Sequence, residues 1–323
     1  MEKPVIRISV RNLVEFILRN GDLESGGTAG DKEAMLKGSR LHRKIQKQMG
    51  SHYQAEVSLK KDTEYEDLIL RVEGRADGIF TQNEKICIDE IKGVYKNLEL
   101  LAEPVLVHRA QALCYAWIYL DDHGLEEIDV QMTYVHLDTE MIKRFRETMT
   151  REELESWYQR LLDSYHKWLS YQMKWREERN RSMEKLEFPF IYRKGQKEMV
   201  AGIYHAISRK EQIFIQAPTG VGKTMSAVFP AVRSIGEGKA ETLFYLTART
   251  ITRTVAQDAF EILRKNGLLF KTVTIIAKEK LCFCEKPECN PETCPYAKGH
   301  YDRINDAVYE SVSYTHLTLP TKL

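Results

Sequence analysis

The chain has 323 residues, a length typical of two domains rather than one. Its 48 Lys and Arg balance 47 Asp and Glu, which excludes an unspecific polycation or an acidic tail protein. Its 43% hydrophobic content is that of an ordinary globular protein. The longest apolar run, 112–120, is far shorter than the ~20 residues of a membrane-spanning helix, and the N-terminus lacks a signal-peptide core. We therefore expect a cytoplasmic protein with no membrane partner.

The first half of the chain predicts an α/β unit followed by a long helix. The expected elements are, in order, a strand and an amphipathic helix over 1–20, a glycine-rich loop over 21–30, two or three strands over 55–92, a helix over 104–119 and a strand over 127–137. From Thr139 to about Lys185 the pattern predicts a charged helix or helix pair. Its buried face would comprise Leu154, Tyr158, Leu161, Tyr165 and Trp168.

A second unit begins near Phe188. Strand-like segments over 212–216, 242–246 and 271–277 alternate with helical segments. Alternation of this kind predicts a parallel sheet built from βαβ units.

The last residues have an unusual composition. Residues 312–321 read VSYTHLTLPT, which matches the translation of a transposon-type sequencing adapter. We expect the natural protein to continue beyond about Ser311, and residues 312–323 to be an assembly artefact.

Two carboxylates and a lysine form the first candidate site. Asp77 precedes Glu90 by thirteen residues, and Lys92 follows two residues later. Residues two apart on a strand point to the same side, so Glu90 and Lys92 share a face, and a neighbouring strand can bring Asp77 opposite them. Converging carboxylates attract a hard cation such as Mg²⁺, and an adjacent lysine can orient water or stabilise phosphate charge. Asp89 competes for the acidic role, but strand alternation turns it away from Lys92.

Three further side chains extend this set. His42 lies on a predicted helix and can act as a metal ligand, whereas Gln111 and Tyr115 share one helix face because they are four residues apart. Each residue alone is ordinary, since a solvated strand charge or a helix-surface histidine is the default interpretation.

The ordered patterns GxxxH, GxxD, (D/E)xK and QxxxY resemble the RecB-type branch of the PD-(D/E)XK nucleases. The resemblance covers roughly residues 5–140. It implies that His42, Asp77, Glu90 and the carbonyl of Ile91 bind Mg²⁺ or Mn²⁺. It also implies that Lys92 is catalytic, and that Gln111 and Tyr115 support the site and contact DNA.

A second site is a phosphate-binding loop. The loop lies between a predicted strand and a predicted helix, as nucleotide-binding loops require. Its glycines let backbone N–H groups approach the phosphates of ATP, its lysine reaches the β/γ-phosphates, and its last residue supplies a hydroxyl to Mg²⁺. The loop comprises Ala217, Pro218, Thr219, Gly220, Val221, Gly222, Lys223 and Thr224.

Flanking segments resemble superfamily 2 helicases. Arg193 and Gln196 resemble the adenine-reading Q motif, although Gln196 is alternatively a surface residue that caps the next helix. Thr247, Arg249 and Thr250 resemble motif Ia, and such residues contact the DNA backbone without reading its sequence.

Four cysteines form a third candidate site. Cys282, Cys284, Cys289 and Cys294 have the spacing CxCx₄Cx₄C, which suits either tetrahedral zinc or a 4Fe–4S cluster. Their place after motif Ia resembles the iron–sulfur insertion of DinG/XPD-type helicases, which favours the cluster over zinc. Cys87 and Cys114 are expected to be buried as small hydrophobes.

Together these features predict an α/β protein. Its parts are a PD-(D/E)XK nuclease core over 1–140, a helical bridge over 141–187, and a partial RecA-like parallel-sheet domain with a cysteine cluster insertion over 188–311. The resemblance implies an ATP-dependent 5′→3′ DNA helicase with a metal-dependent nuclease, acting in DNA repair on DNA that is single-stranded or has a single-stranded tail.

The motor appears only in part. No DEAH-like acidic motif and no second RecA-like domain follow Cys294. We therefore expect weak nucleotide binding at most, and no ATP-driven unwinding. The alternatives are a nuclease that acts alone with a DNA-clamping ATP-binding part, and a catalytically inactive DNA-binding module.

Overall fold

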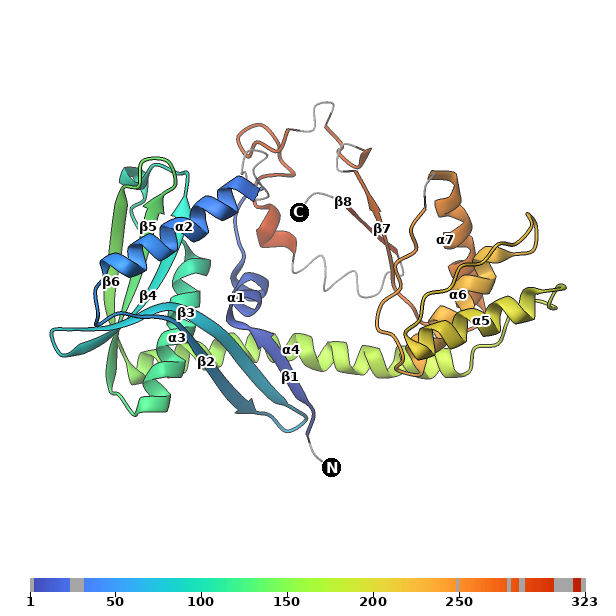
Figure 1. The fold of residues 1–323 in the computed structure, drawn as a ribbon, viewed down its shortest axis with the longest axis horizontal. Coiled ribbons are helices and arrows are strands. Elements are labelled where there is room, and N and C mark those ends of the chain that lie inside the picture. The colour runs from blue at the N-terminus through green and yellow to red at the C-terminus, as the bar shows by residue number, and fades with distance from the viewer. Residues whose placement is uncertain are drawn as a thin grey trace. The chain divides into compact units, whose positions relative to one another are not determined.

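The computed structural model describes residues 3–23, 32–247, 250–277, 280–284, 288–304 and 316–320 (Figure 1). The chain divides into two compact units. The first comprises Met1–Lys167, Ile275–Val312 and Leu319–Leu323, and the second comprises Trp168–Thr274 and Ser313–Thr318.

The first unit is built on a six-stranded mixed sheet. Its strands are β1 (Val5–Ser9), β2 (Gln54–Glu64), β3 (Ile69–Gln82), β4 (Lys85–Val94), β5 (Glu127–His136) and β6 (Ile142–Thr150). The order is β1-β3-β4-β5-β6, and β2 also pairs with β3. The pairs β1–β3 and β4–β5 are parallel, whereas β2–β3, β3–β4 and β5–β6 are antiparallel.

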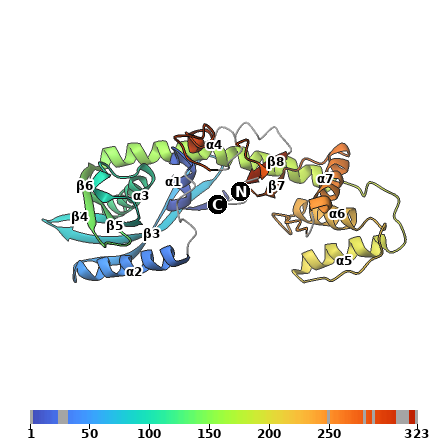
Figure 2. The same cartoon turned by 90° about the horizontal axis from the view of Figure 1, so that it is seen from above.

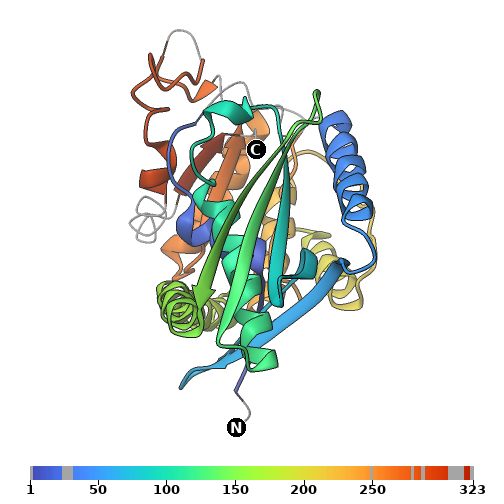
Figure 3. The ribbon, with the colours of Figure 1, turned by 90° about the vertical axis from the view of Figure 1, so that its left-hand side faces the viewer.

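Helices cover both faces of this sheet. They are α1 (Val10–Leu18), α2 (Lys32–Gln48), the short 3₁₀ helix η1 (Leu98–Leu100), α3 (Leu106–His123) and the start of α4 (Arg151–Glu184). Figures 2 and 3 show α2 on one face and α3 on the other. Side chains alternate along β4, so α2 packs on Ile91 while α3 meets Lys92. The predicted strands and helices of residues 1–137 are thereby confirmed.

The predicted helix from Thr139 was wrong over its first part. Residues 142–150 form the edge strand β6, paired with β5 from Val135↔Ile142 to Glu127↔Thr150. The burial of β6 alternates with period two, which is the pattern of a half-buried strand rather than a helix. The 34-residue helix α4 follows, and it buries Leu154, Tyr158 and Leu161 as expected. Tyr165 and Trp168, which were also expected on the buried face, are only half-buried.

The second unit is a helical layer. It contains α5 (Gln196–Arg209), α6 (Lys223–Gly236) and α7 (Thr250–Lys265). Side chains of α6 and α7, together with Met183 and Leu186 from the end of α4 and the residues after it, form one apolar core. Strand β7 (Thr272–Ile276) pairs with β8 (His316–Pro320), which lies in the segment predicted to be an artefact. The artefact itself stays a prediction.

The expected parallel sheet of the second unit does not form among the described residues. Residues 212–216 and 242–246 have no strand conformation, and Phe214 and Leu246 are 94% and 89% exposed. A parallel strand is stable only when neighbouring strands satisfy its backbone groups and helices cover both faces. No described strand pairs with either segment, so the helical part of the prediction is confirmed and its sheet is not. Among the described helices, none is long and apolar enough to cross a membrane.

Candidate functional site

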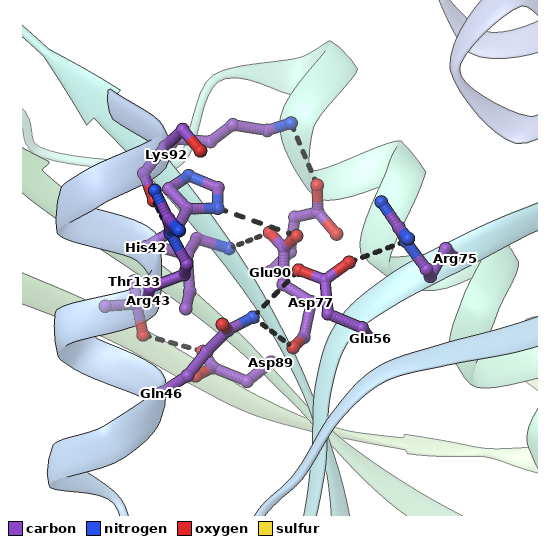
Figure 4. A network of polar contacts seen from close by, with 12 residues as sticks. His42, Arg43, Gln46, Glu56, Arg75, Asp77, Asp89, Glu90, Lys92 and Thr133 are labelled. Atoms are coloured by element: carbon purple, nitrogen blue, oxygen red, sulfur yellow. Dashed lines mark hydrogen bonds and ion pairs between the residues drawn. The ribbon is translucent and has the colours of Figure 1, made fainter. Parts of the chain in front are cut away.

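The two predicted carboxylates lie where β3 and β4 diverge. The antiparallel pairing of these strands runs from Gln82↔Lys85 to Gly78↔Asp89, and Asp77 and Glu90 are the next residues on each strand. Opposite residues of an antiparallel pair point to the same side. The structure thus brings Asp77 beside Glu90, as the sequence predicts, at the opening between two strands (Figure 4).

Glu90 is an almost fully buried acid with one unsatisfied oxygen. Its side chain is 2% exposed, and Oε1 lies 2.8 Å from Nζ of Lys92. Oε2 is buried without a hydrogen-bond partner. Burial raises the pKa of Glu90 to about 8, and the negative charge of Asp77 adds to the rise, while Lys92 opposes it. A buried carboxyl oxygen without a donor is suited to binding a cation, which would favour the ionised form of the group.

Asp77 is held in place from three directions. Its Oδ2 accepts a hydrogen bond of 2.7 Å from the N–H of Ile91, and its Oδ1 lies 3.7 Å from Nδ1 of His42. The amide of Gln46 donates to the backbone carbonyl of Asp77 at 2.9 Å and also to Glu56 (Figure 4). The predicted ligands His42, Asp77 and Glu90 are therefore neighbours.

A close approach of α2 to β4 places His42. Leu41 and Ile45 of α2 pack on Ile91 of β4, in one small core. A Cβ atom added to Gly93 of β4 would lie 3.7 Å from Cα of Gly38 in α2. The absence of a side chain at Gly93 lets the strand lie close to the helix, one helical turn before His42.

Helix α3 supplies the opposite wall of the site. Nζ of Lys92 donates to Oε1 of Gln111 at 2.9 Å. A Cβ atom at Gly74 would lie 2.7 Å from the hydroxyl oxygen of Tyr115, so the tyrosine packs directly on the β3 backbone. Burial raises the pKa of Tyr115, and the negative charge of Glu90 contributes to this rise. Lys92, Gln111 and Tyr115 thus lie together, as predicted.

Asp89 lies on the other face of the sheet. It is fully buried and accepts hydrogen bonds from Thr133 at 2.6 Å, Gln131 at 3.1 Å and Tyr53 at 3.0 Å. These three donors satisfy its carboxylate, so Asp89 is a structural acid. Strand alternation had favoured Glu90 over Asp89 as the partner of Lys92.

Sequence reasoning missed two residues of this region. Gln46 follows His42 by one helical turn and anchors the carbonyl of Asp77. His108 precedes Gln111 by three residues on α3, and burial together with the nearby charge of Lys92 lowers its pKa to about 4. The sequence held a signal for both, because residues three or four positions apart share a helix face. Gln46 is four residues after His42, and His108 is three residues before Gln111.

The residues present fit a divalent cation by their donor chemistry, because Mg²⁺ and Mn²⁺ prefer carboxylate oxygens. The buried, unpartnered Oε2 of Glu90 supports this fit. In the described part of the chain, however, no three His, Cys, Asp or Glu side chains are already gathered around a common point. The metal site thus stays a prediction.

Two glycines of the phosphate loop have left-handed backbone conformations. Gly220 and Gly222 have φ angles of +84° and +76°, in the left-handed region that favours glycine. Gly222 caps α6, which begins at Lys223. The ammonium of Lys223 donates to the carbonyls of Ala217 at 3.0 Å and Pro218 at 2.6 Å, so it lies within the loop.

The two predicted Q-motif residues contact this loop. Oε1 of Gln196 accepts a hydrogen bond of 3.0 Å from the N–H of Arg193, and the Arg193 guanidinium donates to the carbonyl of Gly220. A Cβ atom at Gly222 would lie 2.8 Å from Nε2 of Gln196. Gln196 is 5% exposed, so it is not a surface residue, and its adenine-reading role stays a prediction.

The motif Ia residues are only partly described. Thr247 precedes α7, and Thr250 is its first residue. Arg249, like the side chain of Thr250, lies outside what the structure describes.

The four clustered cysteines lie in one segment of the first unit. Sγ of Cys284 lies 3.8 Å from Sγ of Cys294, and Cys289 and Cys294 are buried. Two thiolates bound to one zinc at ~2.3 Å are separated by about this distance in a tetrahedral site. The donor set fits a thiolate-bound metal, although the described thiols do not yet converge as a group. Cys87 and Cys114 are fully buried, as predicted.

Comparisons with known proteins bear on part of the chain. No curated protein matches it. A solved structure titled "Crystal structure of SSO0001" is 19% identical and covers 48% of this chain and 75% of its own, with a TM-score of 0.33. Residues 193–283 match the family model described as DEAD/DEAH box helicase. This segment contains the phosphate loop, and the match supports an ATP-dependent, helicase-like function that involves ATP, usually with Mg²⁺, and nucleic acid.

Proposed function

We propose that the chain combines a metal-dependent DNA nuclease, centred on Asp77 and Glu90, with a helicase-type ATPase segment. The observation that carries the nuclease is the convergence of Asp77, Glu90 and Lys92 around a buried carboxylate oxygen that has no partner. Structural carboxylates such as Asp89 are fully hydrogen-bonded, whereas this one is not. Acidic side chains whose pKa is strongly shifted, and which lie beside a positively charged group, are typical of functional sites.

The side chains have distinct roles in phosphodiester hydrolysis. A divalent cation bound by Asp77, Glu90 and His42 would supply charge that activates water and neutralises the phosphate. Lys92 stabilises the negative charge that develops on the phosphate during attack. Gln111 fixes the Lys92 ammonium on the face of Glu90.

The surface of α2 supports binding to a nucleic-acid backbone. Arg40, Arg43 and Lys47 are exposed and lie along one side of the helix that carries His42. Lysines and arginines arranged in this way neutralise consecutive phosphates. Since the net charge of the chain is only +1, a local basic row rather than a cationic surface provides the attraction.

The helicase part follows from the match over 193–283 and from the contacts between Gln196, Arg193 and the phosphate loop. We propose that ATP binds at Lys223 and Thr224, and that the intact motor moves 5′→3′ on DNA during repair, with the nuclease cutting the strand it delivers. We also propose that the four clustered cysteines hold a 4Fe–4S cluster, with zinc as the alternative. Metal and acid-labile sulfide analysis separates these two.

Cleavage of labelled single-stranded DNA in Mg²⁺ or Mn²⁺ tests the nuclease. We expect the wild-type chain to cut and the Asp77→Ala and Lys92→Ala variants to lose cleavage. Lys96 is an exposed lysine that follows β4, the strand that carries Lys92. Lys96→Ala is therefore the matched control and should cut normally. Undiminished cleavage by Asp77→Ala would overturn the assignment. Tight Mg²⁺ binding without cleavage by folded wild type would support the inactive DNA-binding module instead.

A further inference from the structure

The cysteine segment is joined to residues from the other end of the chain. Within the first unit, the N–H of Leu23 donates to the carbonyl of Ala297 at 2.9 Å, and the N–H of Tyr301 donates to the carbonyl of Gly21 at 2.9 Å. Residues 19–23 follow helix α1, whereas 297–302 follow the last clustered cysteine. We call residues 19–23 the N-terminal clip.

Two carboxylates reinforce the contact reciprocally. Asp302 accepts a hydrogen bond of 2.8 Å from the N–H of Gly21, and Asp22 accepts one of 2.6 Å from the N–H of Gly299. Each segment therefore supplies an acid that satisfies a backbone donor of the other. The guanidinium of Arg19 also lies 4.7 Å from the centre of the Tyr301 ring, a cation–π distance.

The backbone is shaped for this contact on both sides. Gly21 has a φ of +87° and Gly299 a φ of +59°, and both lie in the left-handed region that favours glycine. Both glycines donate the N–H groups that the opposite acids accept. The pairing is thus built from local conformations that ordinary residues adopt only with strain.

Leu23 of the N-terminal clip packs against the clustered cysteines. It packs against a small apolar cluster formed by Cys289, Cys294 and Ala297, to which Cys284 also contributes. Cys289 and Cys294 are 9% and 6% exposed in this arrangement. A hydrophobic residue over metal-bound thiolates limits the access of water and competing ligands to the site.

We infer that the N-terminal clip completes the cysteine site, by holding the cysteine segment through Gly21 and Asp22 and by shielding its sulfur atoms with Leu23. This inference rests on the proposed binding of a metal or cluster by the four cysteines. The clip residues are not ligands. They act on the site by holding residues 297–302 in place and excluding water, so metal retention depends on residues near the other end of the chain from the ligands.

The test is the rate at which the purified chain loses its bound iron or zinc to a chelator, with metal content measured per chain. We expect Leu23→Asp to lose metal about 10- to 100-fold faster than wild type, the range typical when supporting residues around a metal site are removed. Leu100→Asp places the same charge at a position that is 83% exposed and should behave as wild type. Asp22→Ala should accelerate loss, whereas Asp22→Asn keeps the acceptor oxygen and should restore retention.

The outcomes separate this inference from the proposed function. Wild type without bound metal would overturn the metal proposal and this inference with it. Metal lost in Cys289→Ser but retained at the wild-type rate in Leu23→Asp would overturn the inference alone.

A second measurement covers the case in which Leu23→Asp does not fold. In metal-loaded wild type, the amide hydrogens of Gly21, Leu23, Gly299 and Tyr301 should exchange slowly, and faster in Cys289→Ser. Unprotected amides in the loaded wild type would equally overturn the inference.

Discussion

Nζ of Lys92 on β4 lies 2.9 Å from Oε1 of Gln111 on α3, and this hydrogen bond joins the strand that carries the acid to the helix on the same face. Lys92 also contacts Oε1 of Glu90 at 2.8 Å. The ammonium is therefore fixed between an anion and a neutral acceptor. Gln111 is 9% exposed, so water does not readily replace it. In the proposed nuclease, Gln111 would therefore be a positioning residue for Lys92.

Removing Gln111 should reduce turnover more than substrate binding. We expect Gln111→Ala to lower kcat for DNA cleavage by roughly 10- to 100-fold, because small displacements of a catalytic group have effects of this size. KM should change little, because the proposed contacts of Arg40, Arg43 and Lys47 with the DNA phosphates do not involve Gln111. Single-turnover kinetics measure this split. A rise in KM as large as the fall in kcat would contradict a positioning role. So would unchanged values of both constants.

Glu90 should make stability depend on pH and metal. Its folded-state pKa of about 8 lies above the ordinary value of 4.5, so in the metal-free protein its contribution to stability falls as pH rises from about 4.5 to about 8. Glu90→Gln removes this penalty. In chelator at pH 8 we expect a Tm above wild type, by roughly 2–4 °C for each kcal/mol gained, and little difference at pH 4.5.

The same variant should lose stabilisation by Mg²⁺ or Mn²⁺, because the cation favours the ionised carboxylate. Thermal melts with and without metal at both pH values test this. Asp89→Asn is the contrasting variant, since Asp89 is satisfied by three hydrogen bonds and its loss should lower Tm without changing the metal response. Equal metal stabilisation of wild type and Glu90→Gln would contradict the assignment of Glu90 as a ligand.

Gly78 should tolerate no side chain. A Cβ atom there would lie 1.8 Å from the ring of Tyr53, which packs on β3. The hydroxyl of Tyr53 donates a hydrogen bond to Asp89. We expect Gly78→Ala to lower the free energy of unfolding by roughly 1–3 kcal/mol, the range for overpacking. Gly38→Ala is the control, because nothing lies within 4 Å of its Cβ position and alanine favours the helix. Urea denaturation of both variants measures the difference, and equal stabilities would refute the close packing.

Lys223 should control nucleotide binding independently of cleavage. Its ammonium lies among the loop carbonyls of Ala217 and Pro218, where it can contact phosphates. We expect Lys223→Ala to weaken binding of a fluorescent ATP analogue at least about 10-fold, equivalent to ~1.4 kcal/mol. Lys265→Ala, an exposed lysine in the last turn of α7, should bind as wild type. Unchanged binding in Lys223→Ala would remove the loop from the proposed function.

The sequence alone determined the features that depend on neighbours along the chain. Alternation along one strand separated Glu90 and Lys92 from Asp89. The residue order of the phosphate loop predicted a turn that precedes a helix, and α6 begins at Lys223 directly after Gly222. Helix spacing placed Gln111 and Tyr115 on one face. These are local properties, since the period of a strand or helix decides which side each residue faces.

Only the tertiary structure decided which distant segments meet. The hydrophobic pattern of a segment does not specify which strand it pairs with. Residues 142–150 form an edge strand beside β5. Residues 212–216 and 242–246 pair with none of the described strands. The contact between Leu23 and the cysteine segment has no local signal either. Its hydrogen bonds join residues almost a chain length apart, and their formation depends on chain packing rather than on the conformational preference of either segment.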